Sequence, residues 1–242
     1  MITRLIAAEL AGLRRSWVVW VATLLTVGGA IVARSIAWVT HAIGSTELSA
    51  LPFVRPDIAW SDTAVPLALL AYLIVTSYVF GRDFEDGTID LILTAPVRRG
   101  AIVVARTLVV GIALFLLCLM GWAADAATYG LLATTPLDPG PATGLGAAFG
   151  SGMAAFGTLS LVSWAAVRFR GVLPALGLGI AIQAAALALG GLEAARSLPW
   201  LLPSAIASGG DASLLAVSLT GLLFAGGFAA TVHSLDRVDL SE

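Results

Sequence analysis

The charged side chains that could carry chemistry are concentrated in one stretch of this sequence, RDFEDGTIDLILTAPVRR at residues 82–99. The stretch contains four of the chain's fifteen carboxylates and three of its thirteen basic residues, all of which are arginine. The carboxylates are Asp83, Glu85, Asp86 and Asp90, and the arginines are Arg82, Arg98 and Arg99. Clustered charges of this kind can set the orientation in which a partner protein docks. We therefore interpret the stretch first as a recognition element.

Catalytic chemistry has little support elsewhere in the chain. No lysine occurs, so the phosphate-binding sequence Gly-x-x-x-x-Gly-Lys-Ser/Thr cannot be present. Ser151 and His233 could be the nucleophile and base of a rhomboid-like intramembrane protease, but residue 149 is Phe where that motif requires Gly. His41 falls in a different connection from His233, and Cys118 is the single cysteine, so no metal cluster is expected. The sequence predicts no catalytic residue and no metal site.

The elements that position the charged stretch are apolar enough to cross a membrane. Hydrophobic residues make up 59% of the 242 residues and charged residues 12%, against roughly 25% charged in an ordinary soluble domain. A hydrocarbon core of about 30 Å requires about 20 apolar residues of helix. Runs close to this length occur at 17–37, 63–80, 102–124, 144–167, 172–192 and 213–232. We predict an all-α membrane protein with six transmembrane helices in a single domain, residues 1–242.

Arginine placement predicts how these helices are oriented. With the N-terminus in the cytoplasm, ten of the thirteen arginines lie in or next to inner segments, and Arg34, Arg55 and Arg196 lie outside. Inner connections of membrane proteins carry such an excess of basic residues. Both termini and the stretch 82–99 are therefore expected on the cytoplasmic side. A net charge of −2 provides no basic surface for nucleic acid.

Residues 1–16 have the pattern of an amphipathic helix that lies in the membrane interface. Ile2, Leu5, Ile6, Leu10 and Leu13 share one face. Glu9 lies at the centre of that face, where a lone carboxylate is costly, so we expect an ion pair with Arg82 or Arg99. The alternative is that Glu9 reaches the lipid headgroups. A cleaved twin-arginine leader was also considered for Arg14 and Arg15, but the apolar run that follows is too long.

Within the stretch 81–100 we expect one short helix. Asp83, Glu85 and Asp86 would begin it, since carboxylates favour helix N-termini, and Pro96 would end it. An apolar stripe of Phe84, Thr88, Leu91 and Ala95 would then face a groove in a partner. A strand over TIDLIL is the alternative, because Thr88 and Ile89 are β-branched and Gly87 is a poor helix residue.

This stretch resembles the loop between the second and third helices of ABC-2 type transporter permeases. That loop reads approximately Arg-Glu-x-Glu-x-Gly-Thr, a leucine-rich turn, Pro-Val-x-Arg, and a basic residue seven positions later. The matching residues here are Arg82, Glu85, Gly87, Thr88, Leu91, Leu93, Pro96, Val97, Arg99 and Arg106. Asp83 replaces the first glutamate of the pattern. The N-terminal IAAELAGLRRSW is similar to the opening helix of the same family.

The resemblance implies a permease subunit of an ATP-binding cassette exporter in a bacterial cytoplasmic membrane. The loop helix would be a coupling helix that docks on a separate ATPase subunit, which would hold the ATP and Mg²⁺ that this chain lacks. It would involve Asp83, Phe84, Glu85, Asp86, Gly87, Thr88, Asp90, Leu91, Pro96 and Arg99. A second copy or a sister permease would complete the pathway. Arg98 and Arg99 could instead follow the positive-inside rule.

The transmembrane runs predict an apolar pathway. Gln183 is the strongly polar side chain deepest in a run, and it would contact cargo or join helices. Lipid-like, amphiphilic, peptide or drug-like cargo fits such a pathway better than an ion or a sugar. Small residues in the last three runs predict close helix packing. Residues 198–211 resemble the place where ABC-2 permeases have short outer helices between the fifth and sixth spans, so the resemblance implies such helices here. Two alternative functions stay open: an ion-coupled secondary transporter, and a membrane scaffold or assembly factor.

Overall fold

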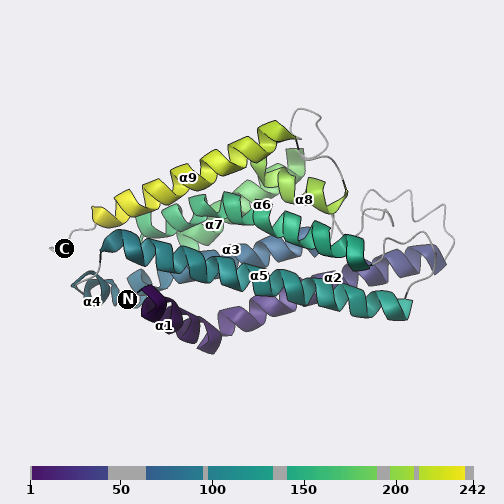
Figure 1. Ribbon diagram of the computed structural model, residues 1–242, viewed down its shortest axis with the longest axis horizontal. Helices are drawn as coiled ribbons and strands as arrows, with labels where there is room; N and C mark the ends of the chain where they lie inside the picture. Colours follow the sequence, from purple (N-terminus) through teal and green to yellow (C-terminus); the bar gives the residue numbers. More distant parts are fainter. Residues whose placement is uncertain are drawn as a thin grey trace.

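The computed structural model describes residues 2–42, 64–94, 98–132, 141–189, 197–209 and 213–237. Within these ranges the chain is helical and contains no strand. The helices are α1 (Ile2–Arg15), α2 (Trp17–Ala42), α3 (Val65–Glu85), α4 (Ile89–Thr94), α5 (Arg99–Leu132), α6 (Pro141–Arg168), α7 (Val172–Leu189), the 3₁₀ turn η4 (Pro199–Leu201), α8 (Leu202–Ala207) and α9 (Leu214–Asp236). The long helices run side by side in one elongated bundle (Figure 1).

Six of these helices, α2, α3, α5, α6, α7 and α9, are long and apolar enough to cross a membrane. Each contains most of one run predicted from the sequence. The third differs most, because α5 extends over 34 residues rather than the 23 of the run 102–124. At about 1.5 Å per residue it is roughly 51 Å long, well beyond an apolar core of about 30 Å. α5 therefore extends past that core, and its first turn lies beside α4.

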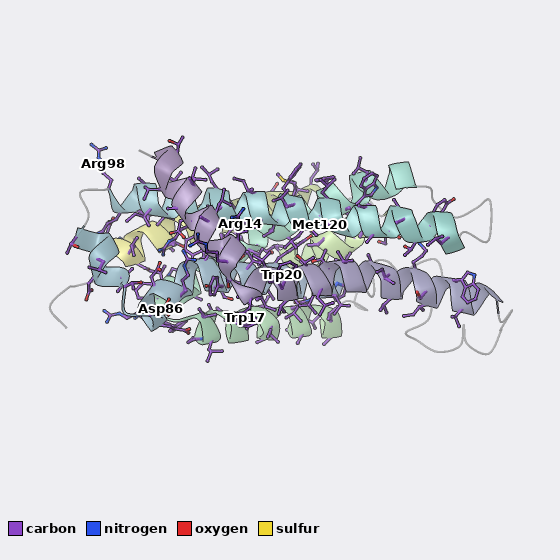
Figure 2. All side chains as sticks on the ribbon, turned by 90° about the horizontal axis from the view of Figure 1, so that it is seen from below. Arg14, Trp17, Trp20, Asp86, Arg98 and Met120 are labelled. Carbon is purple, nitrogen blue, oxygen red and sulfur yellow. The ribbon has the colours of Figure 1, made fainter. Side chains whose placement is uncertain are left out.

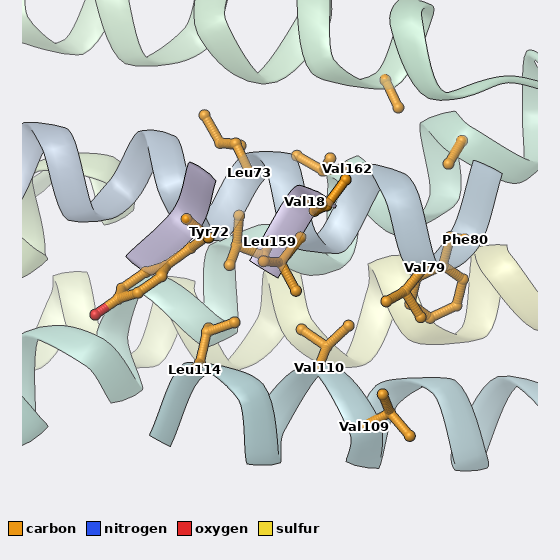
Figure 3. Close-up of a cluster of buried hydrophobic side chains, with 14 of the residues drawn as sticks. Val18, Tyr72, Leu73, Val79, Phe80, Val109, Val110, Leu114, Leu159 and Val162 are labelled. Carbon is orange, nitrogen blue, oxygen red and sulfur yellow. The ribbon is translucent and has the colours of Figure 1, made fainter. Parts of the chain in front are cut away.

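α6 is the central helix of the bundle. It packs against α3, α5, α7, α8 and α9, while α2 packs on α3 and α5. The core between these helices is built from β-branched, leucine and aromatic side chains, with Val79, Val109 and Leu159 almost fully buried (Figure 3). α1 packs across α5 and α2, with Leu13 in the core.

Small residues permit a close helix approach between α6 and α9. A Cβ atom added at Gly227 would lie 2.5 Å from Ser160 Oγ and 2.8 Å from the Ser160 carbonyl carbon. Ser160 Oγ also donates a hydrogen bond of 2.9 Å to the carbonyl of Leu223 on α9. Glycine is thus required at Gly227 for the two backbones to pack at this distance.

The short helices expected in residues 198–211 are present as η4 and α8. α8 packs on α6, with Leu202 and Pro203 buried. The start of α1, α4 and the end of α9 gather at the other end of the bundle (Figure 1). The molecule therefore has two unlike ends, one with η4 and α8 and one with the charged stretch.

Candidate functional site

The charged stretch is two helices separated by a sharp break, not the single helix expected from the sequence. α3 continues through Glu85, and Gly87 then adopts a left-handed φ of 65°. The N–H of Thr88 reaches back to the carbonyl of Asp83 at 2.9 Å, which closes a glycine-type helix end. Asp83 and Glu85 therefore lie in the last turn of α3 rather than at the start of a new helix. α3 extends to Glu85 because none of the residues before Gly87 terminates the helix.

The break also divides the expected apolar stripe. Phe84 lies on α3 and is partly buried against the core, so it is not an exposed anchor. Leu91 lies on α4 and is 74% exposed. Asp86 and Asp90 are exposed beside it, and Thr88 is half-buried between them. Pro96, the expected end of the helix, lies outside the described residues.

Figure 2 shows Asp86 and Arg98 at the same end of the molecule, with the side chain of Arg98 extending away from the bundle. Both side chains are exposed. The surface around α4 thus presents carboxylates, an arginine and one exposed leucine. An exposed apolar side chain surrounded by charges is a typical recognition surface for another protein.

Behind this surface lies a compact cluster of two carboxylates and two guanidinium groups, which we call the charge cluster: Glu9, Arg82, Asp83 and Arg106. Arg106 is 2% exposed, and its Nε donates to Glu9 Oε1 at 3.1 Å. Arg106 also pairs with Asp83, and Arg82 pairs with Glu9. Arg82 Nε lies 3.6 Å from Asp83 Oδ1. The formal charges cancel within the cluster, as burial of ionised groups demands.

The charge cluster joins three helices that are far apart in sequence. Glu9 comes from the apolar face of α1, Arg82 and Asp83 from the last turn of α3, and Arg106 from the first turns of α5. A Cβ atom added at Gly12 would lie 3.1 Å from Arg82 Nη1, so α1 rests directly on the Arg82 guanidinium. Arg82 also lies over the ring of Tyr78, 5.5 Å from its centroid. The cluster fixes α1 to the base of α3 and α5.

The sequence indicated that Glu9 needs an arginine and named Arg82 and Arg99 as partners. The structure brings Arg82 to Glu9 and adds Arg106, which in the sequence only matched the basic residue of the family pattern. Arg99 lies elsewhere. The signal for Arg106 was present in the sequence, because an arginine at the fifth position of the apolar run 102–124 requires a counter-ion.

Glu85 and Arg99 each contact the end of another transmembrane helix. Glu85 Oε1 accepts a hydrogen bond of 2.7 Å from the N–H of Val172, the first residue of α7. Arg99 Nη1 donates to the carbonyls of Leu235 at 2.9 Å and Asp236 at 2.7 Å, in the last turn of α9. The residues on either side of the segment that carries α4 are thus joined to α7 and α9.

A second ion pair lies toward the opposite end of the bundle. Arg34 on α2 donates two hydrogen bonds to Asp125 Oδ1 on α5, of 3.0 Å from Nε and 2.8 Å from Nη2. The Arg34 guanidinium also lies 5.2 Å from the ring centroid of Tyr129. The sequence placed Arg34 on the outer side but did not predict its pairing with Asp125. The pair fastens α2 to α5 away from the charge cluster.

Gln183 joins α7 to α3. Its Nε2 donates a hydrogen bond of 2.9 Å to the carbonyl of Pro66. The same side chain borders a hollow between α3, α6 and α7 together with Leu73, Thr158 and Trp200. Contact with cargo stays a prediction for Gln183, while its bond to Pro66 is a structural role that the geometry provides.

Among the described residues, no three His, Cys, Asp or Glu side chains come together in a way that could hold a metal ion. Ser151, the serine considered for protease chemistry, donates to the carbonyl of Ala148 in its own helix at 3.0 Å. The end of the molecule that carries α4 therefore has features suited to binding a partner and to joining helices. These are an exposed short helix, a buried charge cluster, and two charged side chains bonded to helix ends.

Comparison with known proteins agrees with this arrangement. A family model described as ABC-2 family transporter protein matches residues 5–185. The bacitracin transport permease protein BCRB of Bacillus licheniformis is 26% identical over 207 residues, which cover 77% of this chain and 94% of that protein. The probable ABC transporter permease protein NosY of Stutzerimonas stutzeri is 31% identical over 122 residues, covering 50% of this chain and 42% of that protein. With its six membrane-spanning helices, the chain belongs to the ABC-2 family of transporter proteins and is a multi-pass membrane permease.

Proposed function

We propose that this chain is the permease subunit of an ABC exporter and forms half of the pathway for an amphiphilic, lipid-like, peptide or drug-like substrate. A separate ATPase subunit drives it. The observation that carries the proposal is α4, a helix of six residues that projects an exposed leucine between carboxylates at one end of the bundle. A membrane permease with no lysine needs its ATP to be hydrolysed by another polypeptide.

α4 and its flanking residues form the docking element. Leu91 is the apolar anchor, and Asp86 and Asp90 meet basic residues of the ATPase. Gly87 sets the angle between α3 and α4, because its left-handed backbone lies two residues after Glu85, the last residue of α3. The contribution of Asp83, Phe84 and Thr88 is indirect, because these residues hold this end of α3 on the bundle.

Orientation follows from the placement of the ends. The start of α1, α4 and the end of α9 lie at one end of the bundle (Figure 1), which we assign to the cytoplasm. α1 lies in the membrane interface, with Arg14 and Arg15 exposed in its last turn. The matched relatives come from bacteria, which supports a bacterial cytoplasmic membrane.

Assembly and substrate are the finer parts of the proposal. One chain supplies six spans, and a second copy or a sister permease provides the other half of the pathway. The bundle's surface and hollows are apolar, which suits a lipid-like or amphiphilic cargo. The relative from Bacillus licheniformis is named for bacitracin transport, which makes bacitracin the first compound to test here.

The test is co-expression of this chain with an ABC ATPase encoded beside it, purification through a tag on the permease, and transport in proteoliposomes. Leu91→Asp should reduce the co-purified ATPase by about tenfold, since it puts a charge at a central apolar contact. Leu131→Asp is the matched control, because Leu131 is 83% exposed but lies at the far end of α5. Transport that follows an ion gradient without ATP would instead identify a secondary transporter. Unchanged ATPase binding by Leu91→Asp would contradict α4 as the docking element.

A further inference from the structure

Glu85 and Arg99 differ from the other charges of the stretch 82–99 in what they contact. Glu85 follows Asp83 by two residues, yet it turns away from the charge cluster to the backbone N–H of Val172 at 2.7 Å. Arg99 follows Arg98 directly, yet it turns to the carbonyls of Leu235 and Asp236. Each therefore occupies a site defined by the backbone of a distant helix rather than by another side chain.

The two contacts match the charge that each helix end carries. The first N–H groups of a helix carry partial positive charge and favour a carboxylate, and the last carbonyls carry partial negative charge and favour a cation. Glu85 is a carboxylate at the start of α7, and Arg99 is a cation at the end of α9. If these two side chains were exchanged, each helix end would face a side chain whose charge has the same sign as its own partial charge. The arrangement is thus specific for acid at residue 85 and base at residue 99.

The two contacts also bracket the segment that carries α4. Glu85 is the last residue of α3 and Arg99 the first residue of α5, so 86–98 lies between them. On the Glu85 side the connection is tight. A Cβ atom at Gly81 would lie 2.7 Å from Val172 N and 2.8 Å from the Gly171 carbonyl carbon, so α3 rests on the turn before α7. The two residues that flank 86–98 are therefore bonded to α7 and α9, while they belong to α3 and α5.

We infer that Glu85 and Arg99 are positioning residues that transmit the movement of α4 to α7 and α9, rather than residues that contact the ATPase. The inference rests on the proposed function, because it assigns a route inside the permease for the movement that ATPase docking would impose. Asp86 and Arg98 are their neighbours in sequence, carry the same charges and are exposed. Adjacent residues thus have different roles. Asp86 and Arg98 face the partner, whereas Glu85 and Arg99 hold helices of the bundle together.

The experiment compares these adjacent pairs in the complex with the ATPase. Two quantities are measured for each variant: the ATPase that co-purifies, and the substrate moved per ATP hydrolysed. Glu85→Ala and Arg99→Ala should bind the ATPase as the wild type does but move about fivefold less substrate per ATP, the factor that one net hydrogen bond contributes. Asp86→Ala and Arg98→Ala should instead lower the amount of ATPase that co-purifies, because these exposed side chains face the partner.

Conservative variants separate positioning from a general loss of structure. Glu85→Gln keeps an oxygen that can accept from Val172, and Arg99→Lys keeps a donor for the α9 carbonyls, so both should recover most of the lost ratio. Because Glu85 is exposed, Glu85→Ala should fold, and Arg99→Ala gives an independent second arm. The inference is overturned if Glu85→Ala and Arg99→Ala lose the ATPase at an unchanged ratio, or if the conservative variants recover nothing. If the wild-type chain neither binds an ATPase nor uses ATP, the proposed function itself fails.

Discussion

At the scale of single residues, Arg106 has the most demanding position in the molecule. It lies 2% exposed inside a predominantly apolar helix, and it is balanced by Glu9 and Asp83. Removing one partner of a buried ion pair leaves a charge uncompensated, which costs more than the pair contributed when intact. The charge cluster should therefore respond sharply to substitutions that alter one charge only.

Asp83→Asn is expected to lower the free energy of unfolding by about 3 kcal/mol, because it leaves the Arg106 guanidinium with one carboxylate in a buried site. Unfolding in detergent, followed by tryptophan fluorescence, measures the change. Asp86→Asn is the control, since Asp86 is exposed three residues later. Equal stability of the two variants would show that the cluster does not support the fold.

Gly87 makes a second prediction, which depends on backbone conformation alone. Gly87→Ala should cost about 1 kcal/mol, because φ is 65° there and a Cβ atom is disfavoured in that region. Space is not the cause, since nothing lies within 4 Å of an added Cβ atom. Gly100→Ala has the same free space but lies in α5, so it should be neutral or slightly stabilising. The same unfolding measurement distinguishes them.

Residue types allowed part of this site to be predicted. A carboxylate on the apolar face of residues 1–16 needs a cation, and that reasoning identified Glu9 and included Arg82 as a partner. The same reasoning named Arg99 as a second candidate, but Arg99 contacts the end of α9 instead. It did not identify Arg106 as a partner of Glu9. Charge and hydropathy indicate that Glu9 requires a cationic partner. Which arginine lies near enough to Glu9 depends on how α1 crosses α3 and α5.

At the scale of helices, the connection between α6 and α9 combines close packing with a hydrogen bond. Lipid chains are as apolar as leucine, so helices in a membrane associate through close packing and hydrogen bonds rather than through the hydrophobic effect. Ser160 and Gly227 supply both here. The small residues of the last three runs predicted close packing, but not which glycine lies at a contact.

Gly227→Ala is expected to destabilise the protein by about 2 kcal/mol, because its Cβ atom would overlap Ser160 on α6 and force the helices apart. Gly226→Ala is the matched control, since nothing lies within 4 Å of a Cβ atom at Gly226. Thermal unfolding of the purified variants measures the difference. A loss as large in Gly226→Ala would show that α9 packs through a different face.

At the scale of the whole molecule, the two unlike ends should face opposite sides of the membrane. In a Cys118→Ala background, a cysteine at Asp86 should react with a membrane-impermeant maleimide only after the cells are opened. A cysteine at Ser208, which is exposed after α8 at the other end, should react in intact cells. The reverse pattern would invert the topology and place α4 outside, away from any cytoplasmic ATPase.

The sequence by itself determined the membrane class, the six spans and the absence of a lysine-dependent ATP site. These follow from composition and from apolar run length, which are local properties of the chain. It also located the charged stretch and the glycine that interrupts it. The division into α3 and α4 was missed, because the acidic residues at 83–86 resemble a helix start as much as a helix end.

Only the tertiary structure decided which charges meet. Glu85 lies 87 residues from Val172 in sequence, and Arg99 lies 136 residues from Leu235. Partners at such separations are brought together by how α3, α5, α7 and α9 pack, and no period or motif within one helix encodes that packing. For the same reason the sequence predicted one role for Glu85 and Asp86, whereas the fold bonds Glu85 to the start of α7 and directs Asp86 to the surface beside α4.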